Sequence, residues 1–517
     1  MSTSNRNSLV AIEEQFRQLL HSLSVFHSNR LKIAILIDFF GQLNQKGDPL
    51  LYQSYYQELL PYLLEQVTEE SLLYQPIDQL LRLNKVLLSS HELCPSETES
   101  VDFVKTLQIV KQAMAKTYFY LGEWSDGLSV LWQEYNNETY RNILNDLDHV
   151  EEGSNIEKFN RLVSAMNGED GIPYEVGAEL QEINRDWKQI AGNAREDCIW
   201  TLLTEQQQNT GMFNHQMSIG TIKPLSLKLT VRPADADEDL LLFNNKIMSY
   251  NDLIHQQAQD ALTAGRNIFF HSAAESLPLY KSLFSYPDKS LFYSGDSVGV
   301  AMGLLNLAGL SFLHTGKFRY TLRQEIAVTG PIDMLGNVRP ISDKALSTKL
   351  KTIFFSPFKG VVLPAKNRDT AVNILVELNT KYGNRNLKIL NVDTLADCLN
   401  NQAIVRKEKI LLRERITKKT KRSLSVSIAA IILLLSLGVI YLFNQNVNPS
   451  RLDIKGKTLT IYNSSNKELW KYEFKNEIVS PNQFEAARGR LPRYIFDDLD
   501  GDGNNEVVIG FGSSANK

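Results

Sequence analysis

A serine just before an apolar stretch is the first candidate for chemistry. The run SGDSVG covers residues 294–299, after strand-like residues and before a predicted helix that begins at or near Ser297. At such a place the serine oxygen meets the positive end of the helix, and free backbone N–H groups can hold an oxyanion. The serine needs a base, and none of the eight histidines sits in a triad-like setting. A lysine can replace histidine if burial disfavours its ammonium form and lowers its pKa.

A second candidate site lies near the C-terminus, where carboxylates alternate with other residues. The run DLDGDGNNE covers residues 498–506 and has a glycine for a sharp bend and a closing glutamate. Oxygen donors in this pattern suit Ca²⁺, although Ile509 stands where the closing glutamate of an EF-hand belongs. The expected calcium ligands are Asp498, Asp500, Asp502, Asn504 and Glu506.

Three segments around Ser297 follow one another in a distinctive order. They read GDSVGVAMGLLNLAGL from residue 295, EIAVTGPIDMLGNVRPI from residue 325 and TKLKTIFFSPFKGVVLPAKNRD from residue 348. In order and spacing they resemble the proteolytic domain of Lon proteases, a Ser–Lys dyad family, over the region 220–400. The resemblance implies that Ser297 attacks the peptide carbonyl, that neutral Lys349 takes its proton, and that Thr329 helps to orient the amine. It also implies a homo-oligomer built through this domain.

The catalytic lysine of that family lies on a helix before a strand that ends in Ile-Pro. Counting back from Pro364 places Lys349 at this position, whereas counting forward from Pro340 reaches Ser347. Lys344 is the competing candidate. We favour Lys349 because the residues that follow it then match the family in length and character.

Three positions depart from the family pattern. Val298 replaces a small residue beside the nucleophile, Asp296 replaces a proline, and Pro331 replaces a glutamate. Each change can alter the oxyanion pocket or mark a loss of activity. A catalytically inert, membrane-tethered signalling or scaffold protein is therefore the alternative function.

Lon proteins normally carry an ATP-driven unfoldase, whose phosphate-binding loop reads Gly-x-x-x-x-Gly-Lys-Ser/Thr. The nearest candidate, HTGKF at 314–318, has Phe318 at the Ser/Thr position and lacks the first glycine. We therefore expect no ATP binding. The expected substrates are unfolded proteins or proteins delivered by a partner.

The rest of the chain must position these residues, and 517 residues are too many for one ordinary domain. Residues 1–215 are predicted to form an all-α domain on which a regulator docks, since apolar residues recur there at three- and four-residue spacing. Residues 216–402 alternate β-rich and helical runs, which predicts an α/β or α+β proteolytic domain.

An apolar run separates this region from the tail. Residues 423–443 carry no charge, and a helix of this length covers the roughly 30 Å of a bilayer core. The segment 403–422 before it is strongly basic, which places the preceding region in the cytoplasm. The sequence thus predicts a single-pass protein of the cell membrane with one transmembrane helix and an extracytoplasmic tail.

The tail, residues 444–517, is predicted to be a short β segment. LTIYNSSNKELWKYEF at 459–474 has the pattern of two strands joined by a polar turn. With the acidic loop after it, the tail resembles the calcium-binding FG-GAP repeat of integrin-type β-propellers. One blade cannot close a propeller, so we expect the tail to pair with another chain or to continue in a longer sequence.

Composition excludes two further classes. A net charge of -4 argues against a general nucleic-acid-binding protein, and three widely spaced cysteines form neither a disulfide framework nor a zinc pattern. The sequence as a whole predicts a membrane-anchored, ATP-independent serine endopeptidase that acts on protein substrates on the cytoplasmic side.

Overall fold

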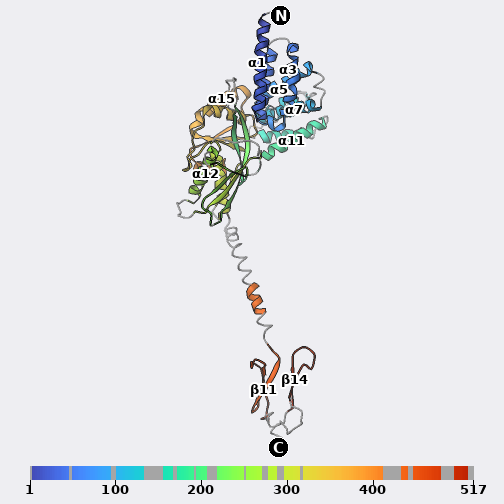
Figure 1. The fold of residues 1–517 in the computed structure, drawn as a ribbon, viewed down its shortest axis with the longest axis vertical. Helices are drawn as coiled ribbons and strands as arrows, with labels where there is room; N and C mark the ends of the chain where they lie inside the picture. Colours follow the sequence, from blue (N-terminus) through green and yellow to red (C-terminus); the bar gives the residue numbers. More distant parts are fainter. Residues whose placement is uncertain are drawn as a thin grey trace. The chain divides into compact units, whose positions relative to one another are not determined.

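The computed structural model divides the chain into two compact units, Met1–Leu411 and Leu412–Lys517 (Figure 1). The structure describes residues 3–45, 49–94, 101–132, 135, 155–166, 172–190, 192, 194–206, 218–233, 235–249, 252–270, 277–287, 296–314, 318–410, 432–439, 446–478 and 494–510.

The first unit begins with a layer of helices, drawn in blue to teal in Figure 1. Apolar residues at helical spacing form its core, which includes Leu36, Phe40, Tyr56 and Leu87. The elements of the layer are α1 (Thr3–Val25), α2 (Asn29–Gln45), η1 (Pro49–Tyr52), α3 (Gln53–Gln66), α4 (Glu69–Leu72), α5 (Ile77–Leu93), α7 (Val101–Leu121), α8 (Trp124–Leu131), α10 (Asn155–Met166) and α11 (Tyr174–Ile190).

An eight-stranded mixed sheet follows, with the strand order β4-β3-β5-β2-β1-β7-β8-β9. Its strands are β1 (Cys198–Gln206), β2 (Ser218–Val231), β3 (Leu240–Phe243), β4 (Lys246–Ile247), β5 (Tyr280–Ser285), β7 (Ile326–Val328), β8 (Gly360–Pro364) and β9 (Lys388–Val392). Strands β1, β7, β8 and β9 run parallel, whereas β1 and β5 each pair with β2 antiparallel. A separate pair joins β6 (Phe318–Leu322) to β10 (Val405–Lys409).

Helices cover both faces of this sheet. One core contains residues of α12 (Leu253–Phe270) and α13 (Gly299–Leu313), together with Leu225 and Leu227 of β2. Another contains Leu346 and Leu350 of α14 (Asp343–Phe354), together with Trp187 of α11. The helix α14 therefore lies in a core shared by the sheet and the helical layer. The elements α15 (Arg368–Tyr382), η2 (Ala365–Asn367) and α16 (Leu395–Asn400) complete the unit.

The predicted boundary between residues 215 and 216 falls inside this sheet. Strand β1 precedes it and β2 follows it, and the two pair over nine positions, from Cys198↔Ser226 to Gln206↔Ser218. Strand β1 was not predicted because its apolar residues follow directly after a long helical region. The helical layer and the sheet therefore belong to one compact unit.

The structure contradicts the predicted membrane span. Its described residues, 432–439, form a helix of eight residues, which covers about 12 Å against the roughly 30 Å of a bilayer core. Within the described residues, no helix is both long enough and apolar enough to cross a membrane. The predictions of a transmembrane helix over 423–443 and of a single-pass location at the cell membrane are therefore wrong. Residues 423–431 and 440–443 lie outside the described residues, as does most of 403–422.

The second unit contains two small antiparallel sheets. The first consists of β11 (Pro449–Lys455), β12 (Thr458–Asn463) and β13 (Glu468–Glu473), and the second is the hairpin of β14 (Tyr494–Asp497) and β15 (Glu506–Ile509). The predicted pair of strands within 459–474 corresponds to β12 and β13, and the sequence reading missed β11. Asn466, at a φ of 57°, turns the chain between β12 and β13.

A close approach of β2 to α14 leads to a stability prediction. A Cβ at Gly220 would lie 2.0 Å from Thr352 Oγ1 and 3.0 Å from the Thr348 carbonyl oxygen. Gly220→Ala must push α14 away and should cost about 1–3 kcal/mol, seen as a lower urea midpoint of the circular-dichroism signal. The control is Gly177→Ala on α11, where a Cβ has no neighbour within 4 Å. An unchanged midpoint for Gly220→Ala would contradict this packing.

Candidate functional site

The serine turn lies at the entrance to α13. Ser297 is half-buried two residues before the first residue of the helix, and Val298 forms its N-cap. The Ser297 carbonyl accepts a 2.8 Å hydrogen bond from the N–H of Gly330, and Val300 N–H donates to the Gly330 carbonyl at 2.9 Å. These two bonds tie the turn to the segment after β7. The strand-like run and Gly295 expected before the serine lie outside the described residues.

The helix that follows is buried almost all round, which is typical of a helix that is apolar on every face. Its N-terminus is held at the site because its body fills the core between α12 and the sheet. Within the described residues, the N–H groups of Ser297 and Val298 donate to no protein acceptor. They are therefore the nearest available donors for an oxyanion formed at the serine.

Lys349 projects from the middle of α14 into the protein. The helix begins after Ser342, whose hydroxyl caps the N–H of Ala345. Only 1% of Lys349 is exposed, and its amine donates a 2.6 Å hydrogen bond to Thr329 Oγ1. The rival candidate, Lys344, lies on the same helix but is exposed. Burial therefore distinguishes the two lysines, which sequence spacing alone did not.

The environment of Lys349 changes its protonation. Burial removes water from the ammonium form and lowers the pKa of this amine from 10.5 to about 7, while the negative charge of Asp296 opposes the shift. A substantial fraction of the lysine is thus neutral at pH 7. A neutral amine has two N–H donors and one lone pair, so a proton acceptor is left after the bond to Thr329.

Thr329 connects the amine to the serine turn. Its N–H donates to the Val362 carbonyl at 3.0 Å, which fixes it at the end of β7, and its hydroxyl donates to the Ser297 carbonyl at 3.4 Å. The hydrogen bonds of the described residues include none between Ser297 Oγ and Lys349 Nζ. All three predicted residues thus meet at one place, with the threonine hydroxyl between the amine and the turn.

The structure describes all three residues that depart from the Lon pattern. Val298 is 5% exposed and belongs to the core around α13. Asp296 accepts the N–H of Gly299 through its carbonyl at 3.2 Å, and its charge acts on Lys349. Pro331 is buried, and its carbonyl accepts the N–H of Arg339 at 2.9 Å. The hydrogen bond between Lys349 and Thr329 is present together with these three residues.

Gly330 has to be a glycine. Its φ is 139°, and a Cβ there would lie 3.2 Å from Pro364 and 3.3 Å from both Val300 and Val338. A side chain would therefore force apart the segment that holds the serine turn.

One buried residue beside the turn was missed by the sequence reading. Gln257 on α12 is 1% exposed, and its side-chain amide bonds to the backbone of Ile332. Gln257 lies three residues after Ile254 and four before Ala261, which places it on the apolar face of the helix. This spacing is the sequence signal from which its burial could have been predicted.

The acidic loop brings together three of its five predicted ligands. Carboxylate oxygens of Asp498, Asp500 and Glu506 lie within 4.8 Å of one another. The carboxylate of Asp502 is not in this group, and its Oδ1 instead accepts the backbone N–H of Asn504 at 2.8 Å.

Backbone hydrogen bonds shape this loop. Asp498 accepts the N–H groups of Gly501 and Gly503 at 2.7 and 2.9 Å, while Glu506 accepts that of Leu499 at 2.7 Å. The two glycines have φ values of 80° and 87°, which suit the sharp bend.

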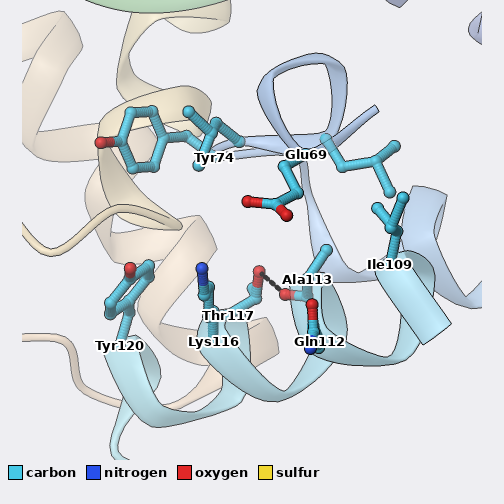
Figure 2. A pocket seen from close by; sticks show the side chains of 10 residues that line it. Glu69, Tyr74, Ile109, Gln112, Ala113, Lys116, Thr117 and Tyr120 are labelled. Atoms are coloured by element: carbon cyan, nitrogen blue, oxygen red, sulfur yellow. Dashed lines mark hydrogen bonds between the residues drawn. The ribbon is translucent and has the colours of Figure 1, made fainter. Parts of the chain in front are cut away.

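The helical layer also contains a cavity, which Figure 2 shows from close by. It has a volume of about 20 Å³, room for about one water molecule, and side chains of Tyr74, Lys116 and Tyr120 surround it. Neither Ser297 nor Lys349 lines it. The cavity is therefore distinct from the candidate dyad.

No protein-family model matches this chain, and comparison with curated proteins finds no similar sequence.

The buried amine predicts a dependence of stability on pH. The pKa of Lys349 is lower in the folded than in the unfolded chain. Burial of its ammonium group therefore lowers the free energy of unfolding by the full amount below pH 7, and this loss of stability shrinks as pH rises toward 10.5. Lys349→Met should therefore stabilise the protein by roughly 4 kcal/mol at pH 7, and by little above pH 10.5. Urea unfolding measured from pH 6 to pH 11 tests this, with Lys344→Met as the control for losing one ammonium group. A Lys349→Met variant less stable than wild type at pH 7 would contradict it.

Proposed function

We propose that the first unit is an ATP-independent serine endopeptidase of the Lon-like, Ser–Lys type. The observation that carries the proposal is the buried Lys349 amine, with a pKa of about 7, bonded to Thr329 beside the Ser297 turn. A buried cation without a carboxylate in hydrogen-bonding contact is costly for a fold, and such cost is typical of functional sites.

The proposed reaction begins with a peptide carbonyl over the Ser297 turn. The neutral Lys349 amine takes the proton from Ser297 as Oγ bonds to the carbonyl carbon, and the N–H groups of Ser297 and Val298 stabilise the oxyanion. The ammonium then gives this proton to the leaving amine, which breaks the peptide bond and leaves an acyl-enzyme. Water, deprotonated by the same amine, then attacks the ester carbon; the bond to Ser297 Oγ breaks, and the ammonium returns the proton to that oxygen.

Thr329 has a supporting part in this scheme. By accepting one N–H of the amine at 2.6 Å, it restricts the rotation of Nζ and leaves the lone pair to accept the serine proton. The same threonine contacts the serine turn through its hydroxyl, so the base and the nucleophile share one anchor. The scheme requires the Ser297 hydroxyl to reach the Lys349 amine, and catalytic hydrogen bonds often form or tighten only when substrate binds.

Loss of either dyad residue should abolish cleavage. We expect Ser297→Ala and Lys349→Met each to lower kcat/KM for an unfolded protein roughly a thousandfold or more, while Lys344→Met keeps wild-type activity. The measurement is fluorescence release from a dye-labelled unfolded substrate, with and without ATP. Equal cleavage by all four proteins would exclude the dyad, and stimulation by ATP would exclude the ATP-independent assignment.

The same proposal predicts the pH profile. Only the neutral amine accepts a proton, so kcat/KM of the wild type should fall about tenfold per pH unit below the lysine pKa of about 7, and level off above it. Cleavage with a profile that is flat between pH 5 and pH 8 would exclude Lys349 as the base, and no cleavage at any pH would favour the alternative function, an inert domain kept for binding.

We also propose that the acidic loop of the second unit binds Ca²⁺ through Asp498, Asp500 and Glu506. The support is the convergence of their oxygens within 4.8 Å and the glycine-shaped bend between them. The side chains of Asp502 and Asn504 are the further oxygen donors that the sequence pattern offers. That a regulator docks on the helical layer stays a prediction. The same is true of assembly of several copies of the chain through the region that contains Ser297 and Lys349.

Calcium titration by calorimetry tests the loop. Asp498→Asn and Glu506→Gln should each weaken Ca²⁺ binding at least about tenfold, because each removes one charged ligand. Glu473→Gln, an exposed carboxylate on β13, is the matched control and should bind as the wild type does. The absence of any calcium-dependent heat in the wild type would rule the site out.

A further inference from the structure

Both polar atoms of the buried Gln257 side chain form a hydrogen bond. Its Nε2 donates to the Ile332 carbonyl at 3.0 Å, and its Oε1 accepts the Ile332 N–H at 2.9 Å. An amide that pairs with both backbone groups of one residue holds that residue in position and orientation. Gln257 thereby attaches α12 to the segment Gly330–Ile332.

That segment is in turn attached to the serine turn. Gly330 exchanges two backbone hydrogen bonds with the turn, one with Ser297 and one with Val300. On its other side the segment is held by Pro331, whose carbonyl accepts Arg339 N–H, and by a bridge between Ile332 and Val338. A movement of Ile332 would therefore be passed through Gly330 to the nucleophile.

Gln257 also touches the turn directly. A Cβ at Gly299 would lie 2.1 Å from Gln257 Oε1 and 2.7 Å from the Ile332 nitrogen, so the glycine backbone packs against both. Gln257, Ile332 and Gly299 thus form one close-packed group behind Ser297. No residue of this group takes part in the proposed proton transfers.

We propose that Gln257 is a positioning residue that clamps Gly330–Ile332 against residues 297–300 and so holds the Ser297 oxygen in reach of the Lys349 amine. This role rests on the proposed peptidase function. Displacement of a reacting atom by about 1 Å can cost about a hundredfold in rate. Loss of the clamp should therefore lower kcat without a matching change in KM.

The first test uses the full chain and three variants. Gln257→Met keeps the volume of the side chain but removes both hydrogen bonds, and should lower kcat about 10- to 100-fold with KM within about twofold. Gln257→Glu keeps an acceptor for Ile332 N–H and should lose less activity at a pH where both variants are folded. Gln256→Met is the matched control, since the amide of Gln256 bonds only within α12, to Asp260, and is exposed.

Labelling of Ser297 by a fluorophosphonate gives a second readout that needs no peptide substrate. The labelling rate, corrected for the folded fraction from circular dichroism, should fall with kcat in Gln257→Met and stay unchanged in Gln256→Met. In a double-mutant cycle, Gly299→Ala should cost less in the Gln257→Ala background than in the wild type, because the amide that its Cβ meets is gone.

The outcomes separate the two ideas. An active wild type with unchanged kcat and labelling in folded Gln257→Met overturns the positioning role alone. A wild type that neither cleaves nor is labelled at Ser297 overturns the peptidase function and this role with it. Strictly additive effects in the cycle would show that Gln257 and Gly299 do not act as one group.

Discussion

The burial of one lysine amine is the constraint on which the rest of the site depends. Lys349 keeps a pKa of about 7 only while water stays away from its Nζ, since desolvation is the leading cause of the shift. Water is excluded because α14 packs in a core to which the sheet and the helical layer both contribute, with Leu350 and Trp187 among its members. The helical layer therefore helps to keep the pKa of the Lys349 amine low.

The attachment of the helical layer to the sheet is accordingly specific. Arg30 of α2 is buried and donates to the carbonyls of Gly220 on β2 and Glu70 on α4, at 3.3 and 2.9 Å. Gly220 also packs closely against Thr352 of α14. A disturbance of the helical layer at Arg30 would thus reach the helix that carries Lys349 through a short chain of contacts.

The serine side of the site depends on a different set of contacts. The turn is held through Gly330, by Thr329 on one side and by the Gln257–Ile332 pair on the other. Lys349 therefore lies on α14, whereas Ser297 lies in the turn before α13, and Thr329 at the end of β7 contacts both.

Local patterns determined much of this in advance. Helical spacing indicated the helices before Ile190, and the order of motifs singled out Ser297, Thr329 and Lys349 along with the carboxylates of the acidic loop. Spacing could not show that β1 joins the sheet or that Gln257 faces Ile332. Those facts depend on which distant segments exclude water from one another, and only the tertiary structure decides that. The match in length already favoured Lys349 over Lys344, and the tertiary structure adds that Lys349 is buried whereas Lys344 is exposed.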